Sequence, residues 1–241
     1  MAELMLITKE GKTFFIKNKN EDYHCQYGKI KKEDLKEGIV KTNTGKELSC
    51  IKPSFNDLYR KIKKRAQIIP LKDVSIILAE TGITKNSIVV DAGTGSGALS
   101  IFLSMYAKKV YSFDIRDDHI EISEENKKYI GTKNLIIKKH NIYENIPHKN
   151  VDVITLDVPE PWEVINNADK ALKLGGYLVS YSPCIPQNAD FVNKIIEHKN
   201  FIHIKTIEIS NRDWEIEGRR IRPKTKEIGH SGFISIARKI L

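Results

Sequence analysis

The residues best suited to chemistry in this chain begin at Asp91, which is followed by three alternate glycines, Gly93, Gly95 and Gly97. An apolar run at 88–90 precedes them, and a helix-prone stretch at 98–103 follows. A strand, a glycine-rich turn and a helix form the unit by which α/β proteins hold a nucleotide-like cofactor. Glycine suits this turn because it accepts a positive φ and lets a ligand approach the main chain. The pattern therefore predicts a cofactor loop, for which S-adenosylmethionine and a dinucleotide are both candidates.

A carboxylate at the end of the next predicted strand is the second candidate group. Asp114 lies 23 residues after Asp91, where a carboxylate can accept both hydrogen bonds of a ribose diol. Residues 116–118 open a predicted helix, so the alternative role of Asp114 is to cap that helix. The ribose role serves either cofactor, and Gly93, Gly95 and Ala98 also satisfy the dinucleotide pattern. These residues alone leave the cofactor open.

Asp157 is the third candidate group, at the carboxyl end of a predicted strand at 151–156. In an open α/β sheet, ligands bind at this edge. The segment Asp-Val-Pro-Glu-Pro-Trp at 157–162 resembles the Asp-x-Pro-Pro-Tyr motif with which amino-methyltransferases address an exocyclic amine. Its two prolines stiffen the loop, although a helix that starts near Pro161 would explain them equally. With this loop the sequence favours S-adenosylmethionine.

Alternating elements place these candidate groups on one edge of a sheet. From residue 66 onward, the patterns predict helices near 73–80, 97–107, 117–129, 162–172 and 188–198. They predict strands near 88–91, 110–114, 135–139, 151–156, 177–181, 201–209 and 231–238. This order predicts a doubly wound α/β sheet over residues 61–241, covered on both faces. Residues 1–60, with short strands at 4–7, 13–16, 23–25 and 38–42 between turns, predict a small all-β domain.

The bulk composition narrows the class of protein. A chain of 241 residues with 40% hydrophobic residues can bury a sizeable core. No stretch approaches the roughly 20 apolar residues of a membrane span, and the N-terminus lacks the pattern of a signal peptide. A cytoplasmic protein is therefore expected. The three scattered cysteines predict reduced thiols, and no metal-ligand spacing is present.

Basic residues are concentrated in two segments. The formal net charge is +9, and residues 1–65 carry +7 of it, with 16 Lys and Arg against 9 Asp and Glu. The first basic cluster spans residues 60–65 and the second spans residues 219–226. Each cluster alone fits a solvated lysine-rich surface equally well. Two such clusters beside a cofactor domain favour binding to a phosphate backbone.

Several segments together resemble one family, the tRNA (adenine-N1)-methyltransferases, which modify position 58 of the T-loop and in archaeal members also position 57. The resemblance spans roughly residues 60–241 and rests on the segments 65–73, 91–98, 156–162, 181–187 and 229–239. The glycine loop alone occurs in many cofactor-binding proteins, whereas the combination of the five segments is specific to this family. It implies a Rossmann-like class I methyltransferase domain over 61–241, behind a small N-terminal β domain over 1–60.

The resemblance also implies a cofactor, partners and site residues. It implies S-adenosylmethionine as cofactor, tRNA as substrate, and a homo-oligomer, expected to be a tetramer. Asp157 and Tyr181 are the implied catalytic-site residues, with Tyr181 helping to shape the adenine pocket. The implied cofactor-binding residues are Gln67, Asp91, Gly93, Gly95, Ser96, Gly97, Ala98, Asp114, Ile115, Asn141, Ile142 and Asp157. Asn141 stands where the family usually has Asp, and its carbonyl can accept the same hydrogen bond.

Two other classes of function remain open at this stage. One is a methyltransferase of another substrate, a protein isoaspartate or a small molecule. The other is a nicotinamide-dependent oxidoreductase or a non-catalytic nucleic-acid-binding module. The loop at 156–162 and the Gly-His-Ser-Gly-Phe segment at 229–233 favour the tRNA enzyme. His230 is expected near the active site, and Trp162 and Trp214 are interpreted as packing residues.

Overall fold

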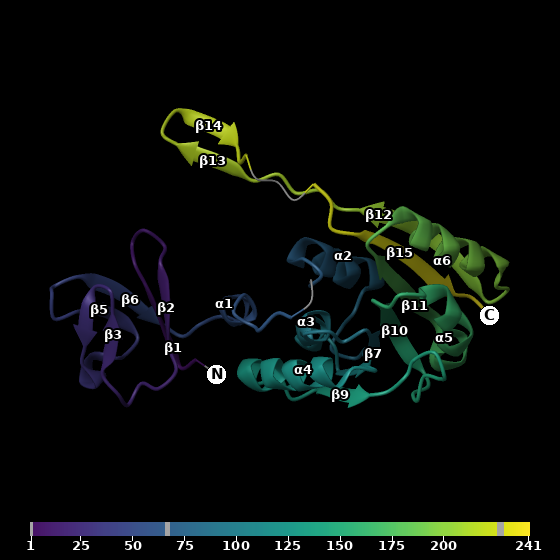
Figure 1. Ribbon diagram of the computed structural model, residues 1–241, viewed down its shortest axis with the longest axis horizontal. Helices are drawn as coiled ribbons and strands as arrows, with labels where there is room; N and C mark the ends of the chain where they lie inside the picture. Colours follow the sequence, from purple (N-terminus) through teal and green to yellow (C-terminus); the bar gives the residue numbers. More distant parts are fainter. Residues whose placement is uncertain (1, 66–67, 226–228) are drawn as a thin grey trace. The chain divides into compact units, whose positions relative to one another are not determined.

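The computed structural model of the chain describes residues 2–65, 68–225 and 229–241. It divides into two compact units, one of Met1–Lys63 with Lys128–Gly131 and one of Lys64–Lys127 with Thr132–Leu241 (Figure 1). Each unit has its own hydrophobic core. None of the described helices is long and apolar enough to cross a membrane.

A four-stranded antiparallel sheet with the order β2-β1-β6-β5 forms most of the first unit. Its strands are β1 (Leu4–Ile7), β2 (Thr13–Ile16), β5 (Gly38–Lys41) and β6 (Glu47–Ile51). A separate hairpin, a 3₁₀ turn and a short helix complete the unit: β3 (Tyr23–Cys25), β4 (Gly28–Ile30), η1 (Lys32–Asp34) and α1 (Phe55–Tyr59). Alternate residues of β6, Leu48 and Cys50, face the core with Leu6, because side chains along a strand alternate between its faces. The pattern does not predict β4 and β6.

A seven-stranded sheet with the order β12-β15-β11-β10-β7-β8-β9 forms the second unit. Its strands are β7 (Ile88–Ala92), β8 (Lys109–Asp114), β9 (Leu135–Lys139), β10 (Val151–Leu156), β11 (Leu172–Ser182), β12 (Phe201–Glu208) and β15 (Phe233–Lys239). Neighbouring strands in the part of the sheet that runs β11-β10-β7-β8-β9 are parallel. Strand β15 is antiparallel to both of its neighbours, β11 and β12. Because the chain order reverses between β7 and β10, a ligand crevice is expected at the carboxyl ends of these two strands.

Helices cover both faces of this sheet (Figure 1). They are α2 (Leu71–Thr81), α3 (Ala98–Ser104), α4 (Asp117–Ile130), η2 (Pro161–Val164), α5 (Ile165–Ala171) and α6 (Ile185–Glu197). One face presents Val90, Ile154 and Leu178 from three neighbouring strands to α5 and α6, and α3 packs on β7, β8 and β9. The predicted fold class, a Rossmann-like sheet with a small β domain, is confirmed.

In the second unit, the structure differs from the sequence prediction mainly in two places. The predicted helix at 162–172 is a 3₁₀ turn followed by a short α5, because the chain turns into an extended β11 at Leu172. A hairpin that the pattern does not predict joins β12 to β15: β13 (Trp214–Glu217) and β14 (Arg220–Pro223), with Gly218 at a φ of 58° in its turn. Both strands alternate apolar and charged residues, which is typical of strands, but the basic residues of this segment are interpreted only as a phosphate-binding cluster.

Candidate functional site

Four residues form a row across neighbouring strands at the carboxyl edge of the second unit's sheet. The registers pair Ala92 with Phe113 and with Leu156, and Leu156 with Ser180. The residues one position later, Asp114, Gly93, Asp157 and Tyr181, therefore lie next to one another. The fold thus brings Asp114, the glycine loop at Gly93 and Asp157 together with Tyr181.

Glycine is required at the two turning points of the cofactor loop. A β-carbon on Gly93 would lie 1.9 Å from the carbonyl oxygen of Asp157, because the Asp157 backbone packs directly on this glycine. The two segments are joined by a hydrogen bond of 2.8 Å from Asp157 N to Ala92 O. Gly97 has a φ of 78° where α3 begins, and a β-carbon there would crowd Ser123. The glycine loop and the Asp157 loop are therefore parts of one site.

Asp91 lies on β7, two residues before Gly93 of the row. Its side chain does not line the cavity that opens in front of the row. Its carboxylate accepts hydrogen bonds from the hydroxyls of Ser112 at 2.7 Å and Thr155 at 2.8 Å. Burial raises the pKa of Asp91 to about 6, against the opposing effect of these two hydroxyls. In this structure the Asp91 carboxylate braces strands β8 and β10 beneath the glycine loop.

Asp114 is the most extensively hydrogen-bonded carboxylate of the row. It accepts from the backbone N–H of Gly95 at 3.0 Å and of Arg116 at 3.0 Å, and its Oδ2 lies 3.0 Å from Nδ1 of His119. The bond from Arg116 shows that Asp114 also supports the start of α4, as the alternative interpretation expects. His119, which also lines the cavity, is a site residue that the sequence did not indicate.

Asp157 is the most exposed carboxylate of the row. Solvent reaches its side chain through the cavity, yet the surrounding protein disfavours the charged form. This desolvation, followed by the charges of Asp91 and Asp114, raises the pKa of Asp157 to about 7. A carboxyl group with this pKa changes its charge near neutral pH.

The loop after Asp157 is held by two residues that sequence reasoning missed. The side-chain amide of Gln187 donates to the carbonyl oxygens of Val158 at 3.3 Å and Pro159 at 2.6 Å. The hydroxyl of Tyr143 accepts from the backbone N–H of Glu160 at 3.1 Å. These bonds add to the stiffness of the prolines. Gln187 follows Pro186 at the start of α6, and this polar residue beside a helix start was the available signal.

A cavity of about 440 Å³ opens in front of the row. Seven predicted cofactor residues line it: Gly93, Gly95, Asp114, Ile115, Asn141, Ile142 and Asp157. Four others do not: Asp91, Ser96, Gly97 and Ala98. Tyr181, predicted for the catalytic site, also lies outside this lining. Gln67 lies outside the described residues. The rest of the lining consists of Arg116, His119 and the largely apolar or aromatic residues Phe113, His140, Tyr143, Val158 and Pro159.

Several predicted residues have structural roles at this edge. The backbone carbonyl oxygen of Ser96 accepts a hydrogen bond from the side-chain amide of Asn126 at 2.8 Å, which fixes the loop on α4, and Ala98 starts α3. The side chain of Asn141 is tied into its own turn, because its Oδ1 accepts from Tyr143 N at 3.1 Å. His230 lies outside the cavity lining, with its ring nitrogens 2.6 Å from Glu208 and 2.7 Å from the oxygen of Pro183.

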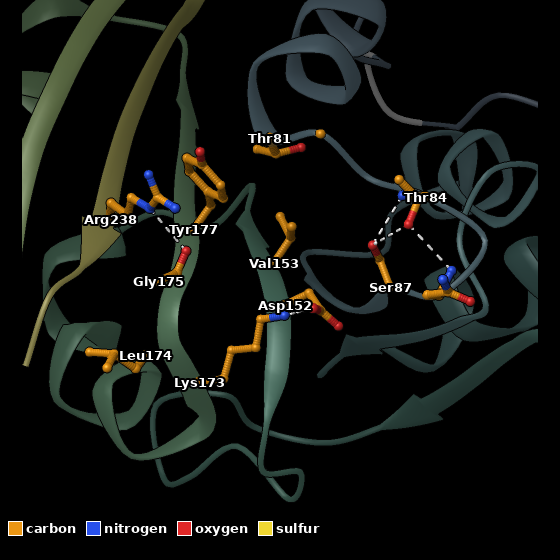
Figure 2. A pocket seen from close by; sticks show the side chains of 12 residues that line it. Thr81, Thr84, Ser87, Asp152, Val153, Lys173, Leu174, Gly175, Tyr177 and Arg238 are labelled. Carbon is orange, nitrogen blue, oxygen red and sulfur yellow. Dashed lines mark hydrogen bonds and ion pairs between the residues drawn. The ribbon is translucent and has the colours of Figure 1, made fainter.

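A second cavity, of about 510 Å³, lies at the opposite, amino-terminal edge of the sheet (Figure 2). Its charged side chains already have partners within the protein. Lys173 forms an ion pair with Asp152, and Arg238 donates to the carbonyl oxygen of Gly175 at 3.1 Å while lying over the ring of Tyr177. Because these charged groups are already engaged by contacts within the protein, the carboxyl edge is the better candidate for the reaction.

The charges at the carboxyl edge distinguish between the two candidate cofactors. A dinucleotide places its pyrophosphate at the glycine loop, and here the carboxylate of Asp157, whose backbone packs on Gly93, would repel that dianion in its charged form. S-adenosylmethionine instead brings a sulfonium and an ammonium group, which carboxylates attract, and a ribose that suits Asp114. The cavity volume lies in the range of roughly 300–1,000 Å³ that holds such ligands. The fold and the site define a Rossmann-like methyltransferase that uses S-adenosylmethionine.

The family described as "tRNA methyltransferase complex GCD14 subunit" matches residues 51–232, and the chain belongs to this family. The resemblance drawn from the motifs is thereby confirmed. The tRNA (adenine(57)-N(1)/adenine(58)-N(1))-methyltransferase TrmI of Methanocaldococcus jannaschii is 34% identical, covering 98% of this chain and 95% of that protein. The tRNA (adenine(58)-N(1))-methyltransferase TrmI of Thermus thermophilus is 28% identical, covering 98% and 96%.

Two solved structures share the whole architecture. A SAM-dependent O-methyltransferase of Thermotoga maritima has a TM-score of 0.87 and 27% identity, covering 100% of this chain and 93% of that one. The tRNA (m1A58) methyltransferase TrmI of Aquifex aeolicus has a TM-score of 0.80 and 21% identity, covering 100% and 99%. At that identity, the second likeness supports the fold alone.

Proposed function

We propose that this protein is an S-adenosylmethionine-dependent tRNA (adenine-N1)-methyltransferase, which acts on adenine 58 of the T-loop, with adenine 57 as a second target. The observation that carries the proposal is the contact between the Gly93 turn and the proline-stiffened Asp157 loop. This contact places Asp157, a carboxylate that can accept a hydrogen bond from an exocyclic amine, directly beside the cofactor cavity. The named relatives in this family, at up to 34% identity, support the same reaction.

For this reaction the protein needs mainly to position the reactants and to stabilise the charge that develops. Adenine N1 already carries a lone pair in the ring plane, so no strong base is needed to create the nucleophile. S-adenosylmethionine, when bound, supplies an activated methyl group. The proposed role of Asp157 is to accept a hydrogen bond from the N6 amine and to stabilise the positive charge that develops on the adenine ring. The apolar walls at Phe113 and Ile142 exclude water.

The proposed cofactor contacts follow from the lining of the cavity. Asp114 would hold the ribose hydroxyls, and the backbone of Gly93 and Gly95 would border the amino-acid portion. Ile115, Asn141 and Ile142 would enclose the adenine portion. Asp91, Ser96, Gly97 and Ala98 would act from below by shaping the loop, and Gln67 keeps its predicted role near the cofactor.

A methylation assay tests the proposed function directly. Unmodified tRNA transcript is incubated with the protein and S-adenosylmethionine, and 1-methyladenosine is mapped by its block to reverse transcription. The expected result is a stop at position 58, lost when that adenine is replaced by guanine. A transcript with adenine at 57 reports on the second target. Methyl transfer to an isoaspartyl peptide or to small molecules, with no stop in the tRNA, would contradict the proposal.

We further propose that residues 1–60 form a separate β domain that helps to bind the tRNA. A buried T-loop adenine must be extruded, at a cost of a few kcal/mol, so the enzyme needs a wide basic surface beyond the catalytic cavity. The first basic cluster, at residues 60–65, begins at the end of this domain and closes the segment 1–65, which carries +7 of the formal net charge of +9. Arg65 of this cluster also lies 3.4 Å from Asp118. In the second cluster, Arg222 pairs with Glu215 at 2.9 Å and Lys224 with Asp213 at 3.1 Å. Because the excess of positive charge lies in the N-terminal segment, the first cluster is the proposed contact with phosphates.

Replacing Lys61, Lys63, Lys64 and Arg65 with Ala should weaken tRNA binding and flatten its salt dependence. Each lost phosphate contact removes about one unit from the slope of log K against log [salt], and a fall of about 1 to 3 is expected for the four. Filter binding at several salt concentrations measures the slope. The matched control replaces Arg219, Arg220, Arg222 and Lys224, three of which are paired with acids. Equal slopes for the two variants would contradict the assignment.

We propose that the protein is a homo-oligomer, a tetramer, joined in part through the β13–β14 hairpin. One face of this hairpin is apolar, since Trp214, Ile216 and Ile221 are 53%, 74% and 61% exposed and lie opposite Pro223 and one another across the strands. The other face carries the ion pairs. An isolated two-stranded hairpin is marginal in water, and a second copy of this face would cover its exposed side chains. Cytoplasm is the proposed location, as expected for a tRNA-modifying enzyme.

The variant Ile216→Asp should dissociate this assembly, because it places a charge at the centre of the apolar face. Light scattering should then report a mass near the 27.6 kDa of one chain. Glu217→Gln, on the ion-paired face of the same strand, is the control and should retain the parent mass. A monomeric parent protein, or an oligomer that survives Ile216→Asp, would remove the hairpin from the proposal.

A further inference from the structure

A buried polar cluster joins three segments of the second unit beside the proposed active site. It consists of Lys72 and Asp73 at the start of α2, Tyr181 on β11 and Ser231 before β15. Asp73 is completely buried, and Tyr181 and Ser231 are 8% and 7% exposed. A buried carboxylate destabilises the fold unless it is paired and hydrogen-bonded, so a cluster of this kind requires an explanation.

The number of protons that each group carries determines the direction of every hydrogen bond in the cluster. The ammonium of Lys72 donates to Asp73 Oδ1 at 2.8 Å, to the carbonyl oxygen of Ile209 at 2.7 Å and to Ser231 Oγ at 2.5 Å. Its three protons are then used. The hydroxyl of Ser231 donates to Asp73 Oδ2 at 2.8 Å. The groups left for the Tyr181 hydroxyl, which lies 3.4 Å from Asp73 Oδ2, are therefore acceptors, so Tyr181 is held as a donor.

The ring of Tyr181 is also confined from its other side. A β-carbon on Gly232 would lie 2.4 Å from Cζ and 2.6 Å from the hydroxyl oxygen of Tyr181. The main chain at Gly232 thus lies directly against the phenol. Ser231 and Gly232 together account for part of the Gly-His-Ser-Gly-Phe segment, since one anchors the hydroxyl and the other leaves room for the ring.

The confined phenol lies next to Asp157. The parallel register that pairs Leu156 with Ser180 puts Asp157 beside Tyr181 at the edge of the sheet. Burial raises the pKa of Tyr181 above its ordinary value, and the negative charges of Asp73 and Asp157 act in the same direction. Tyr181 is therefore a neutral phenol throughout the working pH range, and its ring can serve as a fixed wall.

We propose that Asp73, with Lys72 and Ser231, is a positioning residue that acts through Tyr181, holding the phenol as the wall of the substrate pocket beside Asp157. The inference rests on the proposed function for its substrate. Without the Asp73 anchor, the ring gains freedom and the target base is less well oriented against Asp157. Misplacement of this kind lowers turnover more than it lowers binding.

A double-mutant cycle with Asp73→Asn and Tyr181→Phe tests whether the two residues act together. Each single variant is expected to lower kcat about tenfold, and the double variant no more than about tenfold, since both remove the same constraint. The KM for tRNA and the dissociation constant for S-adenosylmethionine should change less than about threefold. Glu80→Gln, at the far end of α2, is the control and should match the parent enzyme. Additive losses of about a hundredfold would overturn the proposal.

A measurement independent of activity separates this inference from the proposed function. Fluorotyrosine is incorporated into the full chain, and the ¹⁹F resonance of Tyr181 is assigned by its loss in Tyr181→Phe. The parent should give one narrow signal, and Asp73→Asn should shift or broaden it as the ring becomes mobile. Ser231→Ala provides the same test if Asp73→Asn does not fold. An unchanged signal overturns the positioning role even if tRNA is methylated, and a changed signal supports it even if the substrate proves different.

Discussion

Asp157→Asn is expected to slow tRNA methylation by about 100- to 1,000-fold, the loss typical when one group that stabilises developing charge is removed. The asparagine keeps the size of the side chain but presents only a neutral carbonyl to the N6 amine. Affinity for S-adenosylmethionine should fall by less than about fivefold, because Asp114 and the glycine loop remain. Single-turnover methylation and calorimetric cofactor binding measure the two effects separately. Near-normal turnover would remove Asp157 from the mechanism.

The same substitution should change the pH dependence of the reaction. The carboxylate form accepts the hydrogen bond, and the pKa of Asp157 is about 7 in the free protein. Below that pH the group binds a proton, so kcat/KM should fall by about tenfold per pH unit, and this limb should disappear in Asp157→Asn. Asp152→Asn, on the same strand but at the opposite edge, is the matched control and should retain the limb (Figure 2).

Gly93→Ala is expected to have the largest effect on the fold and on cofactor binding together. Its φ is 89°, and the added methyl carbon would lie 1.9 Å from the backbone oxygen of Asp157. Backbone cannot move aside as a flexible side chain can, so the two loops must separate. A loss of more than about 3 kcal/mol in the free energy of unfolding is expected, together with loss of S-adenosylmethionine binding. Chemical denaturation and calorimetry measure both.

Gly82→Ala separates the clash at Gly93 from the strain of a positive φ. Gly82 ends α2 at a φ of 61°, and no atom lies within 4 Å of the position of its added β-carbon. Only the strain of the positive φ acts at this position, and it should lower the free energy of unfolding by about 1 kcal/mol. Cofactor affinity should be unchanged in this control. If the two alanine variants lose stability equally, the packing of Asp157 on Gly93 does not govern the site.

Local patterns in the sequence are sufficient to predict most of this architecture. Alternating apolar segments predict the seven strands of the large sheet, and the glycines at 93, 95 and 97 predict its loop, because each depends on the chemistry of adjacent residues. The strand ends that carry Asp114 and Asp157 follow from the same periodicity. The hairpin that contains Trp214 is not predicted, and Trp214 itself does not pack inside the chain as the sequence predicts, because it is 53% exposed. A side chain's burial depends on what the rest of the chain covers.

The sequence by itself determined the class of fold, the glycine loop and the three acidic groups of this protein. Only the tertiary structure decided that Asp91 lies beneath the site rather than in it, and that Tyr181 is anchored by Asp73. It likewise showed that Arg220, Arg222 and Lys224 of the second basic cluster form ion pairs with acids on or next to the facing strand. The physical reason is that these facts depend on the register between strands and on contacts between residues more than 100 positions apart, such as Asp73 with Tyr181 and Ser231.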